Sequence, residues 1–176
     1  PDNGNGGYVR GVEISGALEF GKVLPALNGF GISGSVAYTD SNLNPTSGST
    51  LVRIPGLSDW VYNLTGYFEK DGFQLRASYR YRSAFKGEVV ALFTNLAYTE
   101  VLADKQLDAQ IGYTFQEGSP LEGLGIVLQV SNVLDSPYRT RLGLDAGGVR
   151  TSDGTALPET YEKYGRQWLV GISYKF

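Results

Sequence analysis

The chain has 176 residues, a length that suits one ordinary domain or a segment of a larger one. Its 15 basic and 18 acidic residues give a formal net charge of −3, which provides no basis for binding nucleic acid. The sequence holds no cysteine and no histidine, which excludes disulfide scaffolds, thiol nucleophiles, Cys-based zinc sites and the commonest general base.

Seven segments alternate strictly between apolar and polar residues, which is the two-residue period of a β-strand. In chain order they occupy residues 12–20, 30–38, 60–68, 73–81, 107–115, 124–132 and 168–176. None of the positions on the apolar face is charged, and Asn132 is the only one that is neither apolar, aromatic nor glycine. The interleaved face carries the charged residues. The sequence therefore predicts an all-β fold of about seven antiparallel strands.

The links between these segments alternate in length along the chain. Residues 21–29, 71–72 and 116–123 form short links, whereas residues 39–59, 83–104 and 133–167 form long ones. The long links hold many of the Gly, Ser, Thr, Asp, Asn and Pro residues, a composition typical of loops. We therefore expect short turns at one end of the sheet and long loops at the other.

The shortest link, Asp71-Gly72, predicts a type I′ turn, whose two central residues both need positive φ. With Lys70 paired to Phe73, both faces of the hairpin stay chemically uniform, and a slip of one residue would mix them. An arginine that faced lipid at the membrane midplane would cost about 2–4 kcal/mol. We therefore expect the polar face to line a lumen, as a structural wall rather than a substrate site. Its charged residues are Glu69, Arg76, Arg80, Arg82 and Asp108.

Alternation alone does not distinguish a membrane barrel from a soluble one, whose apolar face points inward. Three features favour the membrane. Aromatic residues gather at the ends of the apolar stripes, as in the girdles of transmembrane barrels. Short turns oppose long loops, which is the periplasmic and extracellular asymmetry of such barrels. The sequence also ends on an apolar stripe, at Phe176. We therefore expect the apolar face to contact lipid.

The acidic residues of the longest link are a weaker signal. Asp145, Asp153, Glu159 and Glu162 have the oxygen ligands that calcium prefers, but we interpret them as solvated loop charge rather than as a calcium site. Luminal carboxylates are scattered over different strands, and nothing in the sequence resembles a catalytic constellation. We therefore expect no enzyme activity, no cofactor and no metal.

The last quarter of the chain contains two distinctive segments. Residues 132–138 are Asn-Val-Leu-Asp-Ser-Pro-Tyr. They resemble the N-L-F-D-x-P-Y segment near the end of TonB-dependent outer-membrane receptors, with Val-Leu in place of the usual Leu-Phe. Residues 164–168 and 171–176 are similar to the family's closing strand. Residues 54–58 and 79–83 resemble the branch common in the Xanthomonas and Caulobacter lineages. Together the resemblance runs from about Tyr8 to Phe176.

The resemblance implies that residues 1–176 are the C-terminal portion of a transmembrane barrel, namely the last seven of about 22 strands. The family's N-terminal plug domain and TonB box have no counterpart in this sequence. Such receptors lie in the outer membrane of Gram-negative bacteria, bind a scarce solute at extracellular loops and import it with TonB-coupled energy. Members most like this branch are often linked with carbohydrate uptake, and others with siderophores or cobalamin.

The resemblance also implies particular residues and partners. Aromatic platforms for a carbohydrate are expected on the long links or their stems, although loop packing explains them equally well: Phe93, Tyr98, Tyr138, Tyr161 and Tyr164. The barrel-assembly machinery is expected to read the terminal pattern Trp168, Val170, Ile172, Tyr174 and Phe176. Further expected partners are outer-membrane lipid and lipopolysaccharide, TonB through the N-terminal region, the small-molecule solute and a surface lipoprotein.

Two alternatives remain at this point. A self-contained small barrel that acts as an anchor or adhesin would need an even number of strands, and seven are predicted. An outer-membrane lipase or protease would need a general base, and these residues include no histidine.

Overall fold

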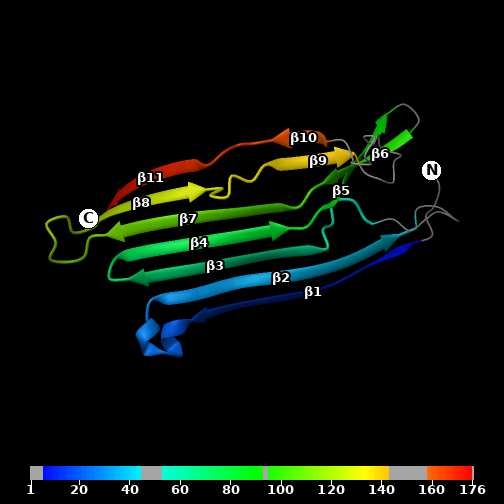
Figure 1. Ribbon diagram of the computed structural model, residues 1–176. Helices are drawn as coiled ribbons and strands as arrows, with labels where there is room; N and C mark the ends of the chain where they lie inside the picture. Colours follow the sequence, from blue (N-terminus) through cyan, green and yellow to red (C-terminus); the bar gives the residue numbers. More distant parts are fainter. Residues whose placement is uncertain (1–5, 45–52, 93–94, 143–157, 176) are drawn as a thin grey trace.

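The computed structural model describes residues 6–44, 53–92, 95–142 and 158–175, and it consists of two antiparallel sheets (Figure 1). The larger sheet has seven strands in the order β1-β2-β3-β4-β7-β8-β11. These strands are β1 (Gly7–Glu19), β2 (Phe30–Leu43), β3 (Trp60–Lys70), β4 (Phe73–Arg82), β7 (Asp104–Thr114), β8 (Leu124–Ser131) and β11 (Gln167–Tyr174). Each overlaps one of the seven predicted segments, which confirms the all-β antiparallel fold.

A second sheet of four strands lies in the order β10-β9-β6-β5. Its strands are β5 (Phe85–Leu92), β6 (Asn95–Val101), β9 (Tyr138–Leu142) and β10 (Pro158–Glu162). The interpretation of residues 83–104 and 133–167 as loops was therefore wrong for these segments. In the chain, β5 follows β4, β6 precedes β7, β9 follows β8 and β10 precedes β11. The two sets of strands have the same order in space, so the smaller sheet continues the larger one beyond an interruption in each strand. β9 and β10 have only five residues each, too few for alternation to reveal them, and the register between β5 and β6 shifts between Lys86 and Val89.

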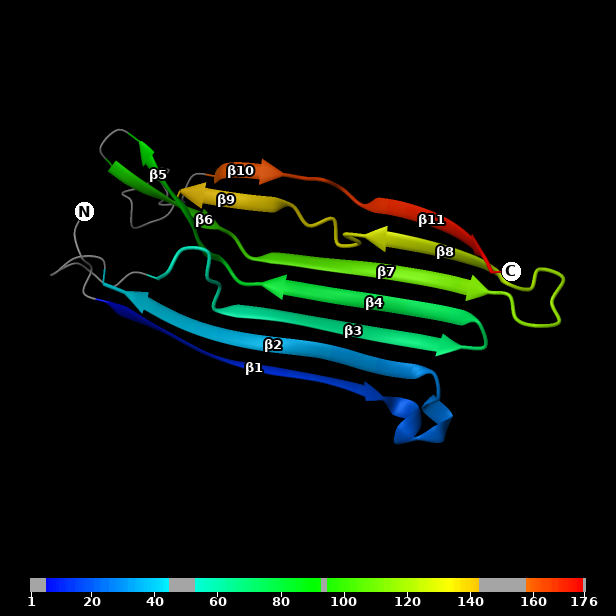
Figure 2. The same cartoon turned by 180° about the vertical axis from the view of Figure 1, so that it is seen from behind.

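The short links lie at one end of the larger sheet, as expected (Figure 2). The link between β1 and β2 holds two 3₁₀ turns, η1 (Phe20–Lys22) and η2 (Pro25–Leu27). Asp71 and Gly72 have φ values of 50° and 82°, which the predicted type I′ turn requires. Lys70 pairs with Phe73 in the predicted register, and the pairing continues to Val61 opposite Arg82. Among the described residues, no helix is long and apolar enough to cross a membrane.

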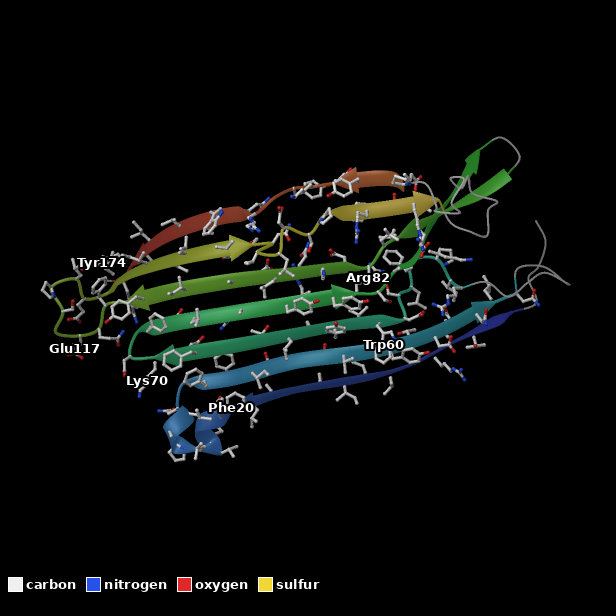
Figure 3. All side chains as sticks on the ribbon, in the orientation of Figure 1. Phe20, Trp60, Lys70, Arg82, Glu117 and Tyr174 are labelled. Atoms are coloured by element: carbon white, nitrogen blue, oxygen red, sulfur yellow. The ribbon has the colours of Figure 1, made fainter. Side chains whose placement is uncertain are left out.

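The apolar face of the larger sheet has no protein layer over it within the described part of the chain (Figure 3). Ile172 is 74% exposed and Ile14 is 66% exposed, although both belong to the apolar stripes. Val101, in the smaller sheet, is the one described hydrophobic residue that counts as buried. A continuous apolar face of this extent is typical of contact with lipid or with another apolar surface.

Aromatic rings form two clusters on this face, one near each end of the strands. At the short-link end the Phe30 and Phe68 rings lie 4.4 Å apart, and at the other end the Tyr38 and Trp60 rings lie 4.8 Å apart. From Trp60 to Phe68 the strand rises about 26 Å. A strand tilt of about 40° leaves roughly 20 Å of height, which fits the apolar band of about 25 Å in outer-membrane barrels. The arrangement is that of two aromatic girdles.

Candidate functional site

A polar cleft of about 510 Å³ lies where the two sheets meet. The larger sheet contributes Arg80, Gln106 and Asp108 to its lining, and the smaller sheet contributes Tyr138 and Glu162. The larger sheet also contributes Asp104, Ser131 and Gln167, and the rest comes from the segments between β8 and β9 and between β10 and β11. Its volume falls within the roughly 300–1,000 Å³ of small-molecule sites. The structure thus gathers, on the polar face, residues that lie far apart in the chain.

Asn132 fixes the segment that interrupts pairing between β8 and β9, which we call the β8–β9 break; the segment between β10 and β11 is the β10–β11 break. Its backbone N–H donates to Asp108 Oδ1 at 2.9 Å, and its side-chain Oδ1 accepts a bond from the Ser136 N–H at 2.9 Å. Its Nδ2 donates to the carbonyl oxygens of Ser136, at 3.2 Å, and Gly165, at 3.1 Å. Asn132 has a φ of 55°, a left-handed conformation that asparagine adopts more readily than most residues. The Asn132 side chain therefore links the β8–β9 break to the β10–β11 break.

Two further contacts join the same breaks. Lys163 Nζ lies 2.7 Å from Asp135 Oδ2, and the Arg166 Nε donates to the Val133 carbonyl at 2.8 Å. The hydrogen bond to Asp135 raises the pKa of Lys163 above its ordinary value. Both contacts join the segment between β8 and β9 to the segment between β10 and β11. They therefore hold the β9–β10 pair at the end of the larger sheet.

Arg80, Gln106 and Asp108 interact with one another at the floor of the cleft. Arg80 Nη2 donates to Gln106 Oε1 at 2.6 Å and to Asp108 Oδ2 at 3.3 Å. Within the described part of the chain, the side chain of the neighbouring Asp104 makes no ion pair or hydrogen bond. Arg80 therefore has a carboxylate partner in Asp108. Asp104 lies opposite Arg82 in the β4–β7 pair, and the Arg82 side chain bonds to Ser58 and Gly56 instead.

Two tyrosines form the rim of the cleft. Tyr164 is 69% exposed and donates its hydroxyl to Glu162, which raises the pKa of Tyr164, so the hydroxyl stays protonated at neutral pH. Tyr138, at the start of β9, is the second aromatic residue of the lining. Tyr161 is 63% exposed on β10 but does not line the cleft. Phe93 lies outside the described residues, and of Tyr98 only the backbone, in β6, is described. The structure thus brings together two of the five expected platforms.

The expected polar wall is spread along the face rather than gathered in one site. Arg76 pairs with Glu69 at 3.1 Å, and both side chains are about half-exposed. Arg80 and Asp108 belong to the cleft, as described above. Carboxylates thus pair with both Arg76 and Arg80.

Arg82 has a different set of contacts, which the sequence did not predict. Its Nε donates to Ser58 Oγ at 2.7 Å, and its Nη2 donates to the Gly56 carbonyl at 2.6 Å. The guanidinium also lies 3.8 Å from the centre of the Phe85 ring. Ser58 is buried, with 5% of its surface exposed. Arg82 thus anchors the link between β2 and β3 instead of forming part of an open wall.

Replacing Arg82 with lysine should release this link, because an ammonium cannot make both hydrogen bonds and keep the stacking on Phe85. Each hydrogen bond from a charged group is worth about 1.5–3 kcal/mol. We therefore expect trypsin to cleave the folded protein after Arg53 about ten times faster or more. Arg76→Lys is the control, since lysine can still pair with Glu69. Equal cleavage rates in the two variants would contradict the anchoring role.

The terminal strand β11 lies at one edge of the larger sheet. Its apolar-face residues are all well exposed: Trp168, Val170, Ile172 and Tyr174. Phe176, the last member of the expected assembly pattern, lies outside the described residues. The exposure leaves this pattern accessible along one edge, and its recognition by assembly machinery stays a prediction.

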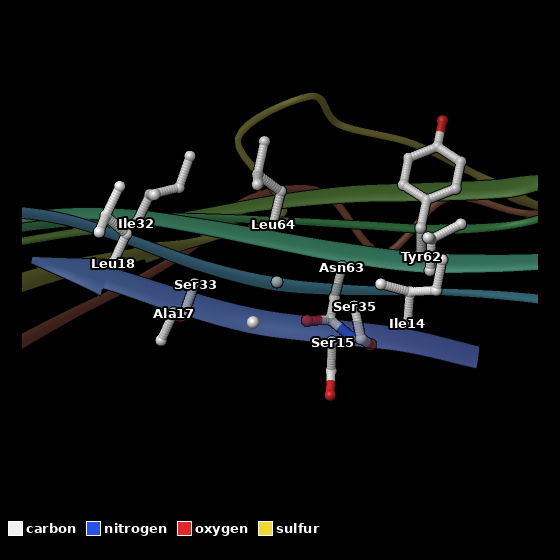
Figure 4. A pocket seen from close by; sticks show the side chains of 13 residues that line it. Ile14, Ser15, Ala17, Leu18, Ile32, Ser33, Ser35, Tyr62, Asn63 and Leu64 are labelled. Atoms are coloured by element: carbon white, nitrogen blue, oxygen red, sulfur yellow. Dashed lines mark hydrogen bonds between the residues drawn. The ribbon is translucent and has the colours of Figure 1, made fainter.

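A second hollow, of about 650 Å³, lies on the apolar face and has a different character (Figure 4). Gly16 pairs with Gly34 at its base, and a Cβ on Gly16 would meet nothing within 4 Å. The labelled Ile14, Leu18 and Leu64 point away from the face to which Ser15 belongs. The surface of this hollow is mainly apolar, so the polar cleft is the better candidate for a solute.

The acidic residues of the longest link form no metal site among the described residues. Glu159 accepts hydrogen bonds from the Thr99 and Thr140 hydroxyls at 3.3 and 3.2 Å, which join β10 to its neighbours in the smaller sheet. Asp145 and Asp153 lie outside the described residues.

Comparison with known families gives one match. The model of the family described as "TonB dependent receptor-like, beta-barrel" matches residues 2–133. This span covers the first six strands of the larger sheet and ends one residue after Asn132. No curated protein matches the chain significantly.

Proposed function

Since the chain belongs to the TonB-dependent receptor-like β-barrel family, we propose that it forms the C-terminal part of the barrel wall of an active transporter. The family implies TonB-coupled transport across the outer membrane of a Gram-negative bacterium, and a transporter rather than an enzyme. The plug domain and TonB box would lie in parts of the protein other than residues 1–176. The larger sheet is open, with β1 and β11 at its edges. In lipid both edges need partner strands, which the rest of a barrel of about 22 strands would provide.

The two faces of the sheet support this role. The apolar face, with its two aromatic clusters, would contact outer-membrane lipid and lipopolysaccharide. The polar face would line the lumen, where Glu69, Arg76, Arg80 and Asp108 contact water, the plug or the passing solute. The smaller sheet would then stand outside the membrane and hold the cleft at the entrance.

The solute that fits best is a carbohydrate or oligosaccharide. The observation that carries this proposal is the cleft itself, which Tyr138 and Tyr164 line together with Gln106, Arg80 and Glu162. Amphipathic rings beside hydrogen-bonding groups suit the apolar faces and hydroxyls of a sugar. The resemblance to the Xanthomonas and Caulobacter branch points the same way. A siderophore or cobalamin is the alternative solute within the same family.

The remaining partners follow from the same proposal. TonB would act through the N-terminal region, and the barrel-assembly machinery would read the exposed residues of β11. A surface lipoprotein would contact the extracellular side, where the smaller sheet and the long links lie.

The test uses the full-length protein in cells with and without TonB. We expect uptake of labelled oligosaccharides to require TonB. Tyr164→Ala should raise the half-saturating concentration about tenfold, or about 1.4 kcal/mol, because it removes one ring of the rim. Tyr161→Ala is the matched control, since Tyr161 is an exposed tyrosine of the same hairpin outside the cleft. Uptake that is independent of TonB, or limited to iron chelates or cobalamin, would contradict the proposal.

A further inference from the structure

The last part of the link between β2 and β3 folds back against the polar face of the sheet. The Ile54 N–H donates to Ser41 Oγ at 3.4 Å, and the Gly56 N–H donates to the Lys86 carbonyl of β5 at 2.7 Å. Ser41 alternates with the apolar-face residues of β2, so it belongs to the polar face, yet it is only 6% exposed. Figure 1 shows the link passing beside the start of β5 on its way to β3. We call residues 54–58 the strap.

Arg82 holds the strap against the sheet. As described above, its guanidinium donates to Ser58 Oγ and to the Gly56 carbonyl, and it lies against the Phe85 ring. All three of these partners are neutral. The docked strap therefore uses the hydrogen-bond donors of Arg82 but supplies no carboxylate for its charge.

A carboxylate faces Arg82 across the sheet. Arg82 pairs with Asp104 in the β4–β7 register, and the two Cβ atoms of such a pair lie about 4.5–5.5 Å apart on the same face. Among the described residues, Asp104 makes no ion pair or hydrogen bond. It lines the polar cleft, and together with Arg82 it lines a hollow of about 250 Å³ that shares Arg80 and Gln106 with the cleft. Asp104 is therefore a second partner within reach of the same guanidinium.

The two partners of Arg82 differ in strength. Two hydrogen bonds from a charged donor, with a ring beside it, outweigh one ion pair between partly exposed side chains. The docked strap is therefore the more populated state. When the strap lifts, these bonds are lost and Asp104 becomes the strongest remaining partner, which lowers the free energy of the lifted state.

We propose that Arg82 is a two-position latch, bound to Ser58 and Gly56 while the strap is docked and to Asp104 once it lifts. Because Asp104 lines the cleft, lifting the strap places a positive charge at the cleft wall. By linkage, any group that occupies Asp104 favours the docked strap. The latch itself goes beyond the proposed function, and only its effect on a solute rests on that function.

The burial of Ser41 provides a measure of the strap's position. The 176 residues contain no cysteine, so Ser41→Cys in the full-length protein gives this segment a single thiol beside the docked strap. The protein is treated in detergent with the neutral reagent N-ethylmaleimide. When the strap opens and closes faster than the thiol reacts, the rate follows the population of the lifted state. The parent protein gives the background rate.

We expect Arg82→Gln to raise the reaction rate at Ser41→Cys about tenfold or more, because it removes the contacts that dock the strap. Asp104→Asn should lower the rate about threefold, because it removes the partner of the lifted state. If Arg82 only held the strap, Asp104→Asn would have no such effect. Combined with Arg82→Gln, Asp104→Asn should leave the rate unchanged, which separates the latch from a direct effect of the carboxylate on the thiol.

Glu117→Gln is the charge control, since it makes an equal change in the link between β7 and β8, and it should not alter the rate. Trypsin cleavage after Arg53, in the protein without the new cysteine, should show the same threefold decrease for Asp104→Asn. A rate that Asp104→Asn leaves unchanged or raises, or one that it lowers equally with and without Arg82, would overturn the latch. Uptake that proves independent of TonB would contradict the proposed function and not the latch, because labelling requires no transport.

Discussion

Asn132→Ala is expected to lower the free energy of unfolding of the full-length barrel by about 3–5 kcal/mol. The variant loses the three hydrogen bonds of the side chain, each worth about 1 kcal/mol net, and leaves the polar groups of Ser136 and Gly165 without these partners. It also places alanine at a φ of 55°, which costs about 1–2 kcal/mol. Urea unfolding of the protein in lipid vesicles measures the change.

The matched control is Asn63→Ala, on the same polar face. Asn63 makes a single side-chain bond, from Nδ2 to Ser35 Oγ at 2.8 Å, so we expect a loss of about 1 kcal/mol. Asn132→Gly separates the two causes, because glycine accepts the positive φ but makes no side-chain bonds. Limited proteolysis should show faster cleavage in the β9–β10 hairpin for both Asn132 variants. Equal stability of Asn132→Ala and Asn63→Ala would show that Asn132 does not hold the two breaks together.

Gly72→Ala is the second substitution with a large expected effect. Gly72 has a φ of 82°, and a Cβ there would lie 2.2 Å from the Thr114 carbonyl oxygen. The same turn accepts the Thr114 N–H at the Gly72 carbonyl, at 2.9 Å, so the turn cannot move away without losing that bond. Positive φ costs alanine about 1–2 kcal/mol, and the loss of the contact adds roughly 1–2 kcal/mol. We expect a total of about 2–4 kcal/mol in the same unfolding measurement.

Gly118→Ala is the control for this substitution. Gly118 has a φ of 85°, and a Cβ there would meet nothing within 4 Å. It therefore carries the cost of positive φ alone, about 1–2 kcal/mol. The difference between the two variants measures the close approach of the β3–β4 turn to β7. If both variants lose the same stability, that approach does not constrain the sheet.

The strands of the larger sheet could be predicted because each has one apolar face and one polar face. A strand with one apolar and one polar face must alternate; the positions from Phe73 to Tyr81 do so throughout, and those from Trp60 to Phe68 do so except at Val61 and Tyr67. The register of this hairpin could also be predicted, since a two-residue turn leaves a single pairing that keeps both faces uniform.

The smaller sheet could not be predicted in the same way. The segment from Tyr138 to Leu142 is five residues long, and its alternation is too brief to stand out from loop sequence. These strands form because the breaks leave their backbones aligned with β7, β8 and β11, where pairing can continue. The breaks themselves are only partly visible in the sequence, as glycine and asparagine at positions with positive φ.

The sequence by itself determined the two faces of the wall and the strands that carry them, because alternation is a local property of each segment. It also contained Arg80, Tyr138 and Tyr164 as separate candidates. Only the tertiary structure decided that these residues surround one cleft and that Arg82 instead anchors a link. The reason is that long links set no register between β4 and β7 or between β8 and β11, so the neighbours of each side chain depend on pairing across the whole sheet.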